Sequence, residues 1–432
     1  MIRAGLLVAL FISGVAVAGE LQLPEPATDA DYAGHTPELI RLGQQLFYDP
    51  ILSGNRNISC ATCHHPRFGT SDGLALGIGE GGIGIGPTRR LDPKNLPEQH
   101  IPRNAPALFN LGAREFTVLF HDGRIEHDPD RPSGLRTPLE DEMVQGFSSL
   151  LSAQTMFPVL SADEMAGHYS ENEIAQAVRQ GRLTGPDGAW DLIAKRVAAV
   201  PAYAQAFSAQ GIGSVAFTDI SDAVAAFMAF EWRSDDSAFD RYLRQGAALP
   251  DTAVRGMALF YGPAGCAECH TGVFQTDHRF HAMGTPQFGP GKAARFETHR
   301  RDLGRGRVTG RAQDAFAFRT PSLRNVALTA PYGHTGSHAD LADFVAYHVD
   351  PVVSAKTFDA ETVPLIDLPG RTPLRDTDQT EVLAAVSRPP VQLTPVEIVE
   401  LIAFLNALTG DTAVTGRLGV PEGVPSGLPV ER

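Results

Sequence analysis

Two pentapeptides of the form C-x-x-C-H contain all four cysteines of this 432-residue chain. The first is Cys60-Ala61-Thr62-Cys63-His64 and the second is Cys266-Ala267-Glu268-Cys269-His270. C-x-x-C-H is the attachment signature of c-type haem. Its two thiols form thioethers with the haem vinyl groups, and the adjacent histidine supplies an axial imidazole to the iron. We therefore predict two covalently bound haem c groups, with His64 and His270 as the proximal ligands.

The same cysteines could instead form a four-cysteine zinc site, two disulfides or two thioredoxin-like dithiols. A zinc site does not need a histidine directly after the second cysteine of both pairs. Thioredoxin-like dithiols usually lie at a strand-to-helix junction in a βαβ pattern, which the sequence does not show. The spacing favours haem, and zinc is the main alternative.

The first residues of the chain read as a secretory signal peptide. They carry one arginine, an apolar run over 6–17, and the small-residue cleavage site Ala16-Val17-Ala18. We expect 1–18 to be removed on export. No later stretch approaches eighteen apolar residues, so we expect no membrane span. Because c-type haem is attached outside the bacterial cytoplasm, the predicted location is the periplasm.

The formal net charge of −14 argues against a nucleic-acid partner, since no basic tract is long enough to offset it. An acidic surface suits a basic protein partner. The 43 glycines and 32 prolines indicate much loop around short helices.

The chain repeats itself at long range. A Gly-x-x-Leu-Phe-Tyr segment precedes each haem motif, at 43–48 and at 256–261. A Pro-x-Leu-x-Asn segment follows each motif, at 106–110 and 321–325, and then His-x-Gly, at 121–123 and 334–336. We predict a duplicated cytochrome c-like unit, with a signal peptide at 1–18, an N-terminal domain at 19–240 and a C-terminal domain at 241–432.

Helix signals flank the two halves, and strand signals are sparse. Thr36 and Pro37 open a predicted helix over 39–47, as N-cap and first helical residue. Thr394 and Glu397 form a capping box for 398–408, and 220–230 is a further apolar helix. The predicted fold class is mainly α: two duplicated cytochrome c-like haem domains with long loops and insertions.

Three stretches read as insertions: 73–86, 126–150 and 349–390. The first is glycine-rich and contains a formal G-x-G-x-x-G, but it leads into Gly86-Pro87 rather than a helix, which disfavours a dinucleotide site. The other two are candidates for a partner-binding surface or a substrate channel, with plain surface elaboration as the alternative.

Over about 36–410 these motifs resemble the bacterial dihaem cytochrome c peroxidase and MauG superfamily. The matching segments beyond the haem signatures are 46–50, 52–54, 58–64, 103–106, 120–124 and 325–332. The resemblance implies a peroxide-reactive haem at His64 and an electron-transfer haem at His270.

In that family a glutamine and a glutamate flank the open face of the first haem, and Gln154 and Glu164 match them in type and spacing. Before its O–O bond breaks, peroxide must lose a proton from one oxygen and gain one on the other. A carboxylate can shuttle that proton if its pKa lies near the working pH, and an amide can orient the peroxide. Asp163 is the alternative acid.

The resemblance also implies a Ca²⁺ ion between the haem domains. Its ligands would be the side chain of Asn104 and the backbone carbonyls of Thr329 and Pro331, completed by water. Oxygen ligands on loops are what Ca²⁺ prefers.

The chain departs from the family pattern between the haems. The family's peroxidases place a tryptophan just before Asp-Gly-Arg, and here that position is His121. Trp190 and Trp232 are the only tryptophans, and neither lies in this motif. An imidazole is harder to oxidise than an indole, so we expect His121 to act as a structural residue or a propionate partner more than as a charge relay.

Two further departures concern access to the irons. The sixth ligand of the second haem is a methionine or a tyrosine in the family and corresponds here to His348, with Met283 and Tyr347 as alternatives. The loop histidine that gates the first haem in some members is replaced in Gly79-Glu80-Gly81, although His100 could substitute. We therefore predict a first haem that is open without prior reduction.

These features predict a periplasmic dihaem oxidoreductase that uses H2O2. Its electrons would come from a small cytochrome c or copper protein, or from side chains of a protein substrate as in MauG. The alternative is a dihaem electron-transfer cytochrome with no catalytic site.

Overall fold

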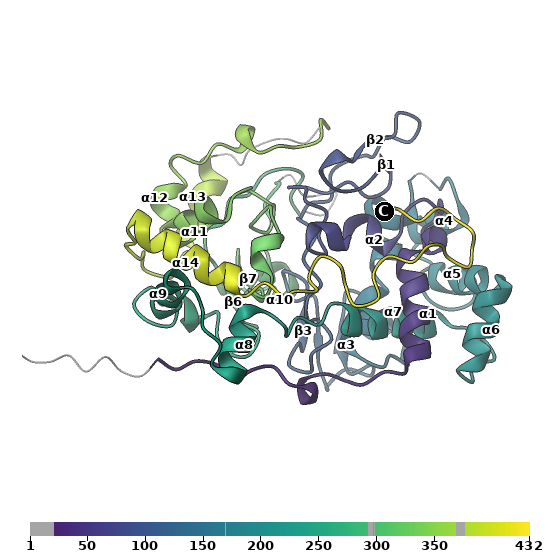
Figure 1. Cartoon of the computed structure of the whole chain (residues 1–432). Helices are drawn as coiled ribbons and strands as arrows, with labels where there is room; N and C mark the ends of the chain where they lie inside the picture. The colour runs from purple at the N-terminus through teal and green to yellow at the C-terminus, as the bar shows by residue number, and fades with distance from the viewer. Residues whose placement is uncertain (1–20, 169, 293–296, 298, 369–375) are drawn as a thin grey trace, which may run out of the picture.

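The computed structural model describes residues 21–168, 170–292, 297, 299–368 and 376–432, so the predicted signal peptide lies outside the described residues. The protein is mainly helical, as predicted from the sequence. The helices of the first half are α1 (Pro37–Tyr48), α2 (Cys60–Cys63), α3 (Leu150–Thr155), α4 (Glu173–Arg179), α5 (Ala189–Ala198), α6 (Pro201–Ala209) and α7 (Phe217–Glu231). Those of the second half are α8 (Ala238–Gln245), α9 (Asp251–Phe260), α10 (Arg305–Thr309), α11 (Leu341–Val349), α12 (Pro351–Ser354), α13 (Asp376–Ala384) and α14 (Pro395–Ala407). Figure 1 shows the two sets at opposite ends of an elongated molecule.

Short antiparallel strands supply the remaining regular structure. They are β1 (Gly82–Ile83), β2 (Arg90–Leu91), β3 (Val118–Leu119), β4 (Ile125–His127), β5 (Leu135–Arg136), β6 (Phe280–His281) and β7 (Phe318–Arg319). β1 pairs with β2, β4 lies between β3 and β5, and β6 pairs with β7. These hairpins hold loops in place and do not form a core sheet.

An equivalent helix crossing occurs in each half. α1 packs against α7, and α9 packs against α14. At each crossing a glycine meets the facing backbone: a Cβ on Gly43 would collide with the carbonyl of Ala223, and one on Gly256 with that of Glu400. Only a residue without a side chain allows this approach. The two glycines hold the same position in the sequence repeat, so the repeat corresponds to a repeated helix crossing.

The repeated Pro-x-Leu-x-Asn segments anchor the haem loops to the ends of these helices. Asn110 and Asn325 both adopt left-handed backbone conformations, with φ of 61° and 62°. The N–H of Asn110 donates to the carbonyl of Trp232, and that of Asn325 donates to Leu408. The Oδ1 atom of Asn110 accepts from the backbone N–H of Ser234 at 2.8 Å, and that of Asn325 accepts from the backbone N–H of Gly410 at 2.7 Å. Asparagine suits this position because it tolerates the left-handed region better than other side chains.

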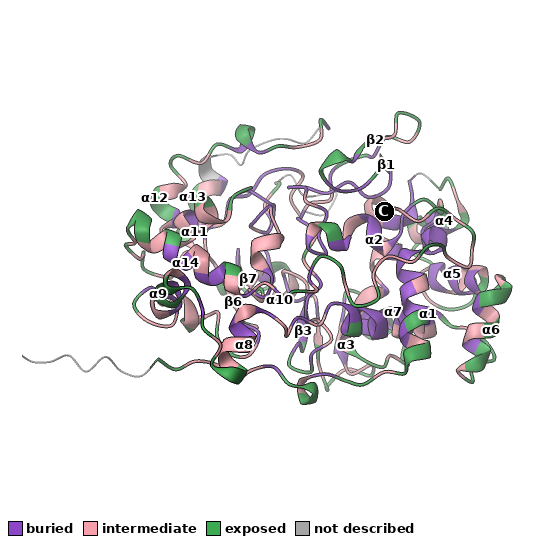
Figure 2. Cartoon of the chain, viewed as in Figure 1, coloured by how far each residue is buried: buried purple, intermediate pink, exposed green. Residues whose placement is uncertain are grey.

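The three predicted helices are confirmed. Thr36 caps α1, its hydroxyl accepting from the N–H of Leu39 at 3.3 Å. Thr394 and Glu397 form the predicted capping box of α14. The apolar stretch 220–230 lies within α7, which Figure 2 shows as largely buried.

Each half has its own apolar core, and both chain ends cross between them. Leu23, near the start of the described chain, packs on the core of the second half. After α14 the chain returns to the first half, where Val430 packs on the first core and Ser426 donates to Asp49 at 2.7 Å. Figure 1 shows this tail running back toward α1 and α2. The domain boundary at 240/241 stays a prediction. The C-terminal tail belongs to the predicted C-terminal domain by sequence, but it packs on the first half.

The predicted insertions contact one another and the rest of the fold. A small apolar cluster joins Ala75 and Leu76 of the glycine-rich stretch to Ala360 and Val363 of 349–390. In 126–150, the hydroxyl of Ser148 donates to Asp222 on α7 at 2.9 Å. Both contacts are internal packing.

Candidate functional site

One cavity of about 470 Å³ extends between the two halves and is lined by both C-x-x-C-H motifs. It is bordered mainly by apolar side chains from both halves. The predicted site residues that line it are Cys60, Cys63, His64, Gln154, Glu164, Cys266, Cys269, His270, His348, His121, Asn104, Thr329 and Pro331. The structure therefore brings the predicted haem ligands, distal pair and inter-haem histidine to one continuous space.

Both proximal histidines are held in the same way. The Nδ1 atom of His64 lies 2.9 Å from the carbonyl oxygen of Thr70, and that of His270 lies 3.2 Å from that of Gln275. A proton on Nδ1 leaves Nε2 with its lone pair free for a metal. Burial lowers the pKa of both rings, that of His270 to about 4, so both are neutral at physiological pH.

The cysteines do not form the alternative sites. All four are free thiols in the described structure, so the two-disulfide interpretation is wrong. Within the described residues the only cluster of His, Cys, Asp and Glu with metal-binding spacing is Cys269, Asp277 and His281, and it contains a single cysteine. A four-cysteine zinc site is therefore not formed, whereas two separate haem attachments fit.

His348 on α11 lies opposite His270 across the second part of the cavity. The centres of the two imidazole rings are 6.4 Å apart. A metal ion bound at about 2.0 Å to one nitrogen of each ring holds the ring centres roughly 6 Å apart. Met283 also lines the cavity, but the hydroxyl of Tyr347 donates to the carbonyl of Gly284 at 2.8 Å. The geometry favours His348 as the sixth ligand.

Gln154 on α3 and Glu164 line the same cavity as His64. Glu164 is carried by a π-helical turn (Ala162–Ala166), which Ser161 caps by accepting from the N–H of Glu164. Burial raises the pKa of the Glu164 carboxyl, and the cations of Arg124 and Lys292 partly oppose this. The alternative acid Asp163 instead accepts from Gln99 at 2.9 Å and does not line the cavity.

The glycine-rich loop is fixed beside Glu164. A Cβ on Gly79 would lie 2.5–2.7 Å from backbone atoms of Asp163 and Glu164, so the loop packs directly on the turn. The N–H of Glu80 donates to the carbonyl of Asp163 at 3.0 Å. The guanidinium of Arg89 donates to the carbonyls of Gly79 and Ile78, both at 2.6 Å.

Glu80, which we match to the family's gating histidine, does not line the cavity. It is fully buried, and its Oε1 atom accepts from the amides of Asn55, Asn57 and Asn95 at 2.7–3.0 Å. His100 does not line the cavity either, and its Nδ1 atom lies 3.2 Å from the carbonyl oxygen of Leu76. Neither residue is placed to close the first haem site.

The region between the two haem motifs is rich in cations and histidines. Arg103 pairs with Asp302 at 2.6 Å and with Asp122 at 2.7 Å. His121 is near them, and burial together with the positive charge of Arg103 keeps the pKa of its ring well below the usual value. His121 is therefore neutral, and its role as a structural residue or a propionate partner stays a prediction.

Four cavity residues were missed from the sequence: Asp72, Lys292, Arg319 and Arg388. They are isolated charged residues, three in loops and Arg319 on the short strand β7, and no spacing pattern points to them. The repeat did offer a signal for His334, which occupies the position of His121 in the second half and lines the same cavity.

The predicted calcium ligands are partly assembled. The Nδ2 atom of Asn104 donates to the carbonyl of Pro331 at 2.6 Å, and its buried Oδ1 atom has no hydrogen-bond partner in the described structure. Thr329 lies two residues before Pro331 and also lines the cavity. An unpartnered amide oxygen beside a loop carbonyl suits a hard cation such as Ca²⁺.

Residues 37–248 match the family of di-haem cytochrome c peroxidases. The chain is 31% identical over 319 residues to the methylamine utilization protein MauG of Methylorubrum extorquens, covering 73% of this chain and 69% of that protein. It is 29% identical over 340 residues to the cytochrome c551 peroxidase of Nitrosomonas europaea, covering 78% and 79%. The crystal structure of a MauG-like protein associated with microbial copper homeostasis superposes with a TM-score of 0.59 at 25% identity, covering 91% of this chain and 95% of that one. No helix in the described part of the chain is long and apolar enough to cross a membrane.

Proposed function

This chain belongs to the di-haem cytochrome c peroxidase and MauG family, and we propose that it reacts with hydrogen peroxide at the haem of His64 and moves electrons through the haem of His270. Family membership makes it an enzyme and an oxidoreductase. In the proposed reaction two electrons and two protons convert one H2O2 to two water molecules. The electrons come from a protein outside this chain.

The observation that carries this proposal is that Gln154 and Glu164 line the same cavity as His64. When bound, the haem supplies an iron that accepts a peroxide oxygen and gives up electrons to it. In this proposal the carboxylate of Glu164 takes the proton from one peroxide oxygen and returns it to the other. Burial raises its pKa toward the working pH, which improves such a shuttle. The amide of Gln154 is placed to orient the peroxide.

The second haem is proposed to store and pass electrons. With His270 and His348 on its two faces it would be six-coordinate and lower in potential than a haem with a His and a Met ligand. The fixed glycine-rich loop supports a first haem that is open before any reduction, because Glu80 and His100 are both bound elsewhere.

Two electron sources fit the family. One is a small cytochrome c or copper protein, as for a detoxifying peroxidase; the other is the tryptophan or tyrosine side chains of a protein substrate, as for MauG. The proposed open first haem and the proposed His348 ligand of the second haem favour a protein substrate as the electron source. The absence of a tryptophan at the position of His121 counts against it. Rapid turnover with reduced cytochrome c would identify the first, and covalent change in a co-exported protein would identify the second.

The proposal is tested with the ferric holoprotein and one equivalent of peroxide, followed by absorption spectroscopy. We expect Glu164→Gln to slow the spectral change by about 10²–10⁴-fold, because an amide cannot take the proton. Asp163→Asn is the matched control, since Asp163 binds Gln99 outside the cavity. An unchanged rate in Glu164→Gln would remove Glu164 from the mechanism, and a wild-type protein inert to peroxide would favour the electron-transfer cytochrome.

Three further assignments belong to the proposal. We assign the protein to the periplasm because of the signal peptide predicted at 1–18, which lies outside the described residues. The domains are placed at 19–240 and 241–432. A Ca²⁺ ion is placed at Asn104, Thr329 and Pro331, supported by the unpartnered oxygen of Asn104.

A further inference from the structure

Glu80 is a buried carboxylate, 0% exposed, that pairs with no lysine or arginine of the described residues. Its Oε1 atom accepts from the side-chain amides of Asn55, Asn57 and Asn95 at 2.7–3.0 Å, and all three donors are neutral. Its Oε2 atom is buried as well and has no hydrogen-bond partner in the described structure. Buried polar atoms normally have partners, and buried charges normally have counter-ions. The unpartnered oxygen of Glu80 therefore indicates a ligand that the side chains of the protein do not supply.

A second carboxylate contacts the same cluster. The Nδ2 atom of Asn55 donates to Oε1 of Glu80 at 3.0 Å and to Oε1 of Glu171 at 2.5 Å, so the two carboxylates share one neutral donor. The Oδ1 atom of Asn55 accepts from Asn172 at 2.9 Å, which fixes the end of the amide that faces the carboxylates. Within the part of the chain that the structure describes, neither carboxylate has an arginine or lysine partner. The cluster thus combines two negative charges with neutral donors alone.

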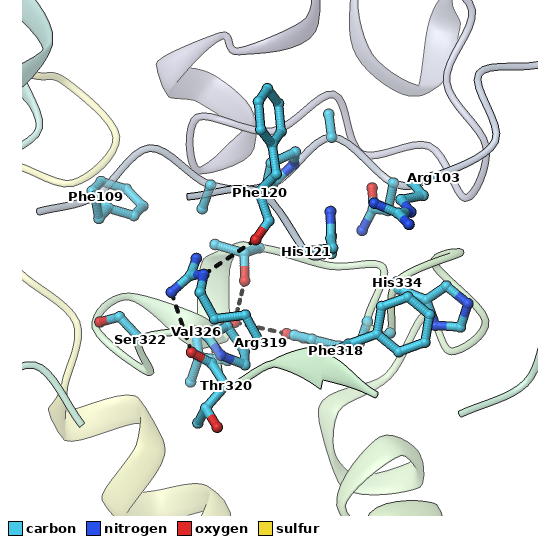
Figure 3. Close-up of a pocket in the computed structure, with 18 of the residues that line it drawn as sticks. Arg103, Phe109, Phe120, His121, Phe318, Arg319, Thr320, Ser322, Val326 and His334 are labelled. Carbon is cyan, nitrogen blue, oxygen red and sulfur yellow. Dashed lines mark hydrogen bonds between the residues drawn. The ribbon is translucent and has the colours of Figure 1, made fainter. Parts of the chain in front are cut away.

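Arg103, on the wall of the haem cavity in Figure 3, shows how this chain neutralises another pair of buried carboxylates. Its guanidinium pairs with Asp122 at 2.7 Å and with Asp302 at 2.6 Å. Nothing equivalent stands between Glu80 and Glu171 among the described residues. Because a buried carboxylate without a counter-ion carries a desolvation cost that neutral donors only partly offset, this cluster calls for a cation. Two carboxylates match a divalent one.

We propose that Glu80, Glu171, Asn57 and Asn95 form a binding site for a Ca²⁺ ion. Carboxylate and amide oxygens on irregular loops are what Ca²⁺ prefers, whereas Mg²⁺ keeps most of its water and demands near-octahedral geometry. The amides of Asn57 and Asn95 present their oxygens to the ion once they turn end for end, and water completes the shell. None of these residues lines the haem cavity, so this site is separate from the one proposed at Asn104.

The four ligands come from three loops around the first haem motif. Asn57 lies just before α2, which carries that motif, and Glu80 and Asn95 lie on either side of the β1–β2 hairpin. Glu171 lies between the π-helical turn of Glu164 and α4. Figure 1 shows β1, β2, α2 and α4 in the same part of the molecule. One ion would therefore tie the glycine-rich loop both to the haem motif and to the turn of Glu164.

The test is calorimetric titration of Ca²⁺ into the intact dihaem protein after its metal has been removed with a chelator. We expect Glu80→Gln to bind one Ca²⁺ fewer than the wild type. Glu171→Gln should weaken the same site by about tenfold or more, because each variant removes one charged ligand. Glu231→Gln is the matched control and should keep the wild-type stoichiometry. Glu231 is also buried, but its two oxygens accept from the N–H groups of Leu418 and Gly419 at 2.7 and 2.8 Å.

Asn104→Ala separates this site from the Ca²⁺ proposed between the haem domains, and it should leave the affinity of the Glu80 site unchanged. Glu171 is exposed, so Glu171→Gln tests the site independently of whether Glu80→Gln folds. Wild-type stoichiometry and affinity in Glu171→Gln, or in Glu80→Gln with both haems attached, would overturn the proposal. A wild-type protein that binds no Ca²⁺, or whose Ca²⁺ binding is lost entirely in Asn104→Ala, would overturn it as well.

Discussion

At the scale of single residues, the proposed second haem site depends on a pair of facing histidines. His348 is on α11 and His270 follows the second haem motif, and their ring centres are 6.4 Å apart. Both rings have pKa values lowered to about 4, mainly by burial, so no proton competes with a metal at neutral pH.

This arrangement predicts the spin states of the two haems. The resting ferric protein should show one high-spin and one low-spin haem in EPR, because two protein ligands are proposed only for the second haem. His348→Ala should convert the low-spin signal to high-spin, and His348→Met should keep it low-spin with a raised potential. Met283→Leu is the control. A low-spin signal that survives in His348→Ala but is lost in Met283→Leu would assign the ligand to Met283.

At the scale of elements, the glycine-rich loop and the π-helical turn that carries Glu164 act as one unit. Gly79 faces the backbone of Asp163 and Glu164 at 2.5–2.7 Å from where a Cβ would be. We expect Gly79→Ala to push the turn away and slow the reaction with peroxide, while both haems stay attached. Gly213→Ala, where the added Cβ meets nothing within 4 Å, is the control. Equal peroxide rates in the two variants would show that the loop does not position Glu164.

Elements set by local or repeated patterns could be predicted from the sequence. The caps of α1 and α14 depend on neighbouring residues, and the glycines of the two helix crossings recur at the same place in each half. The π-helical turn could not be predicted, because packing against Gly79 defines it. His334 could not be assigned a role either, since its lack of hydrogen-bond partners is visible only in the folded chain.

At the scale of the whole molecule, the two halves are joined by buried charges as well as by the haem cavity. Arg103 of the first half reaches Asp302 of the second, and Arg305 of the second half pairs with Glu126 of the first at 2.8 Å. The two chain ends add to this join, since the C-terminal tail reaches the first haem motif, where Thr62 donates to Glu431 at 2.5 Å. The relative position of the haems is thus fixed by ionic contacts and by chain crossing.

The ionic join predicts sensitivity to acid. Burial alone would raise the pKa values of Asp122 and Asp302, but Arg103 and, at Asp122, Arg124 hold both well below the usual range. A carboxyl whose pKa is depressed in the folded state stabilises the protein above its unfolded pKa of about 4, and this contribution is lost as the pH falls below it. We expect thermal stability to drop between about pH 5 and pH 2, and the pH-dependent part to shrink in Arg103→Leu. At pH 7 that variant should lose about 3–5 kcal/mol, because it leaves the buried carboxylate of Asp302 without an ion-pair partner and Asp122 with Arg124 alone. Arg131→Leu, which removes a surface ion-pair partner, should leave the stability nearly unchanged. An Arg103→Leu variant as stable as Arg131→Leu, with the acid transition of the wild type, would show that the halves are not joined through these charges.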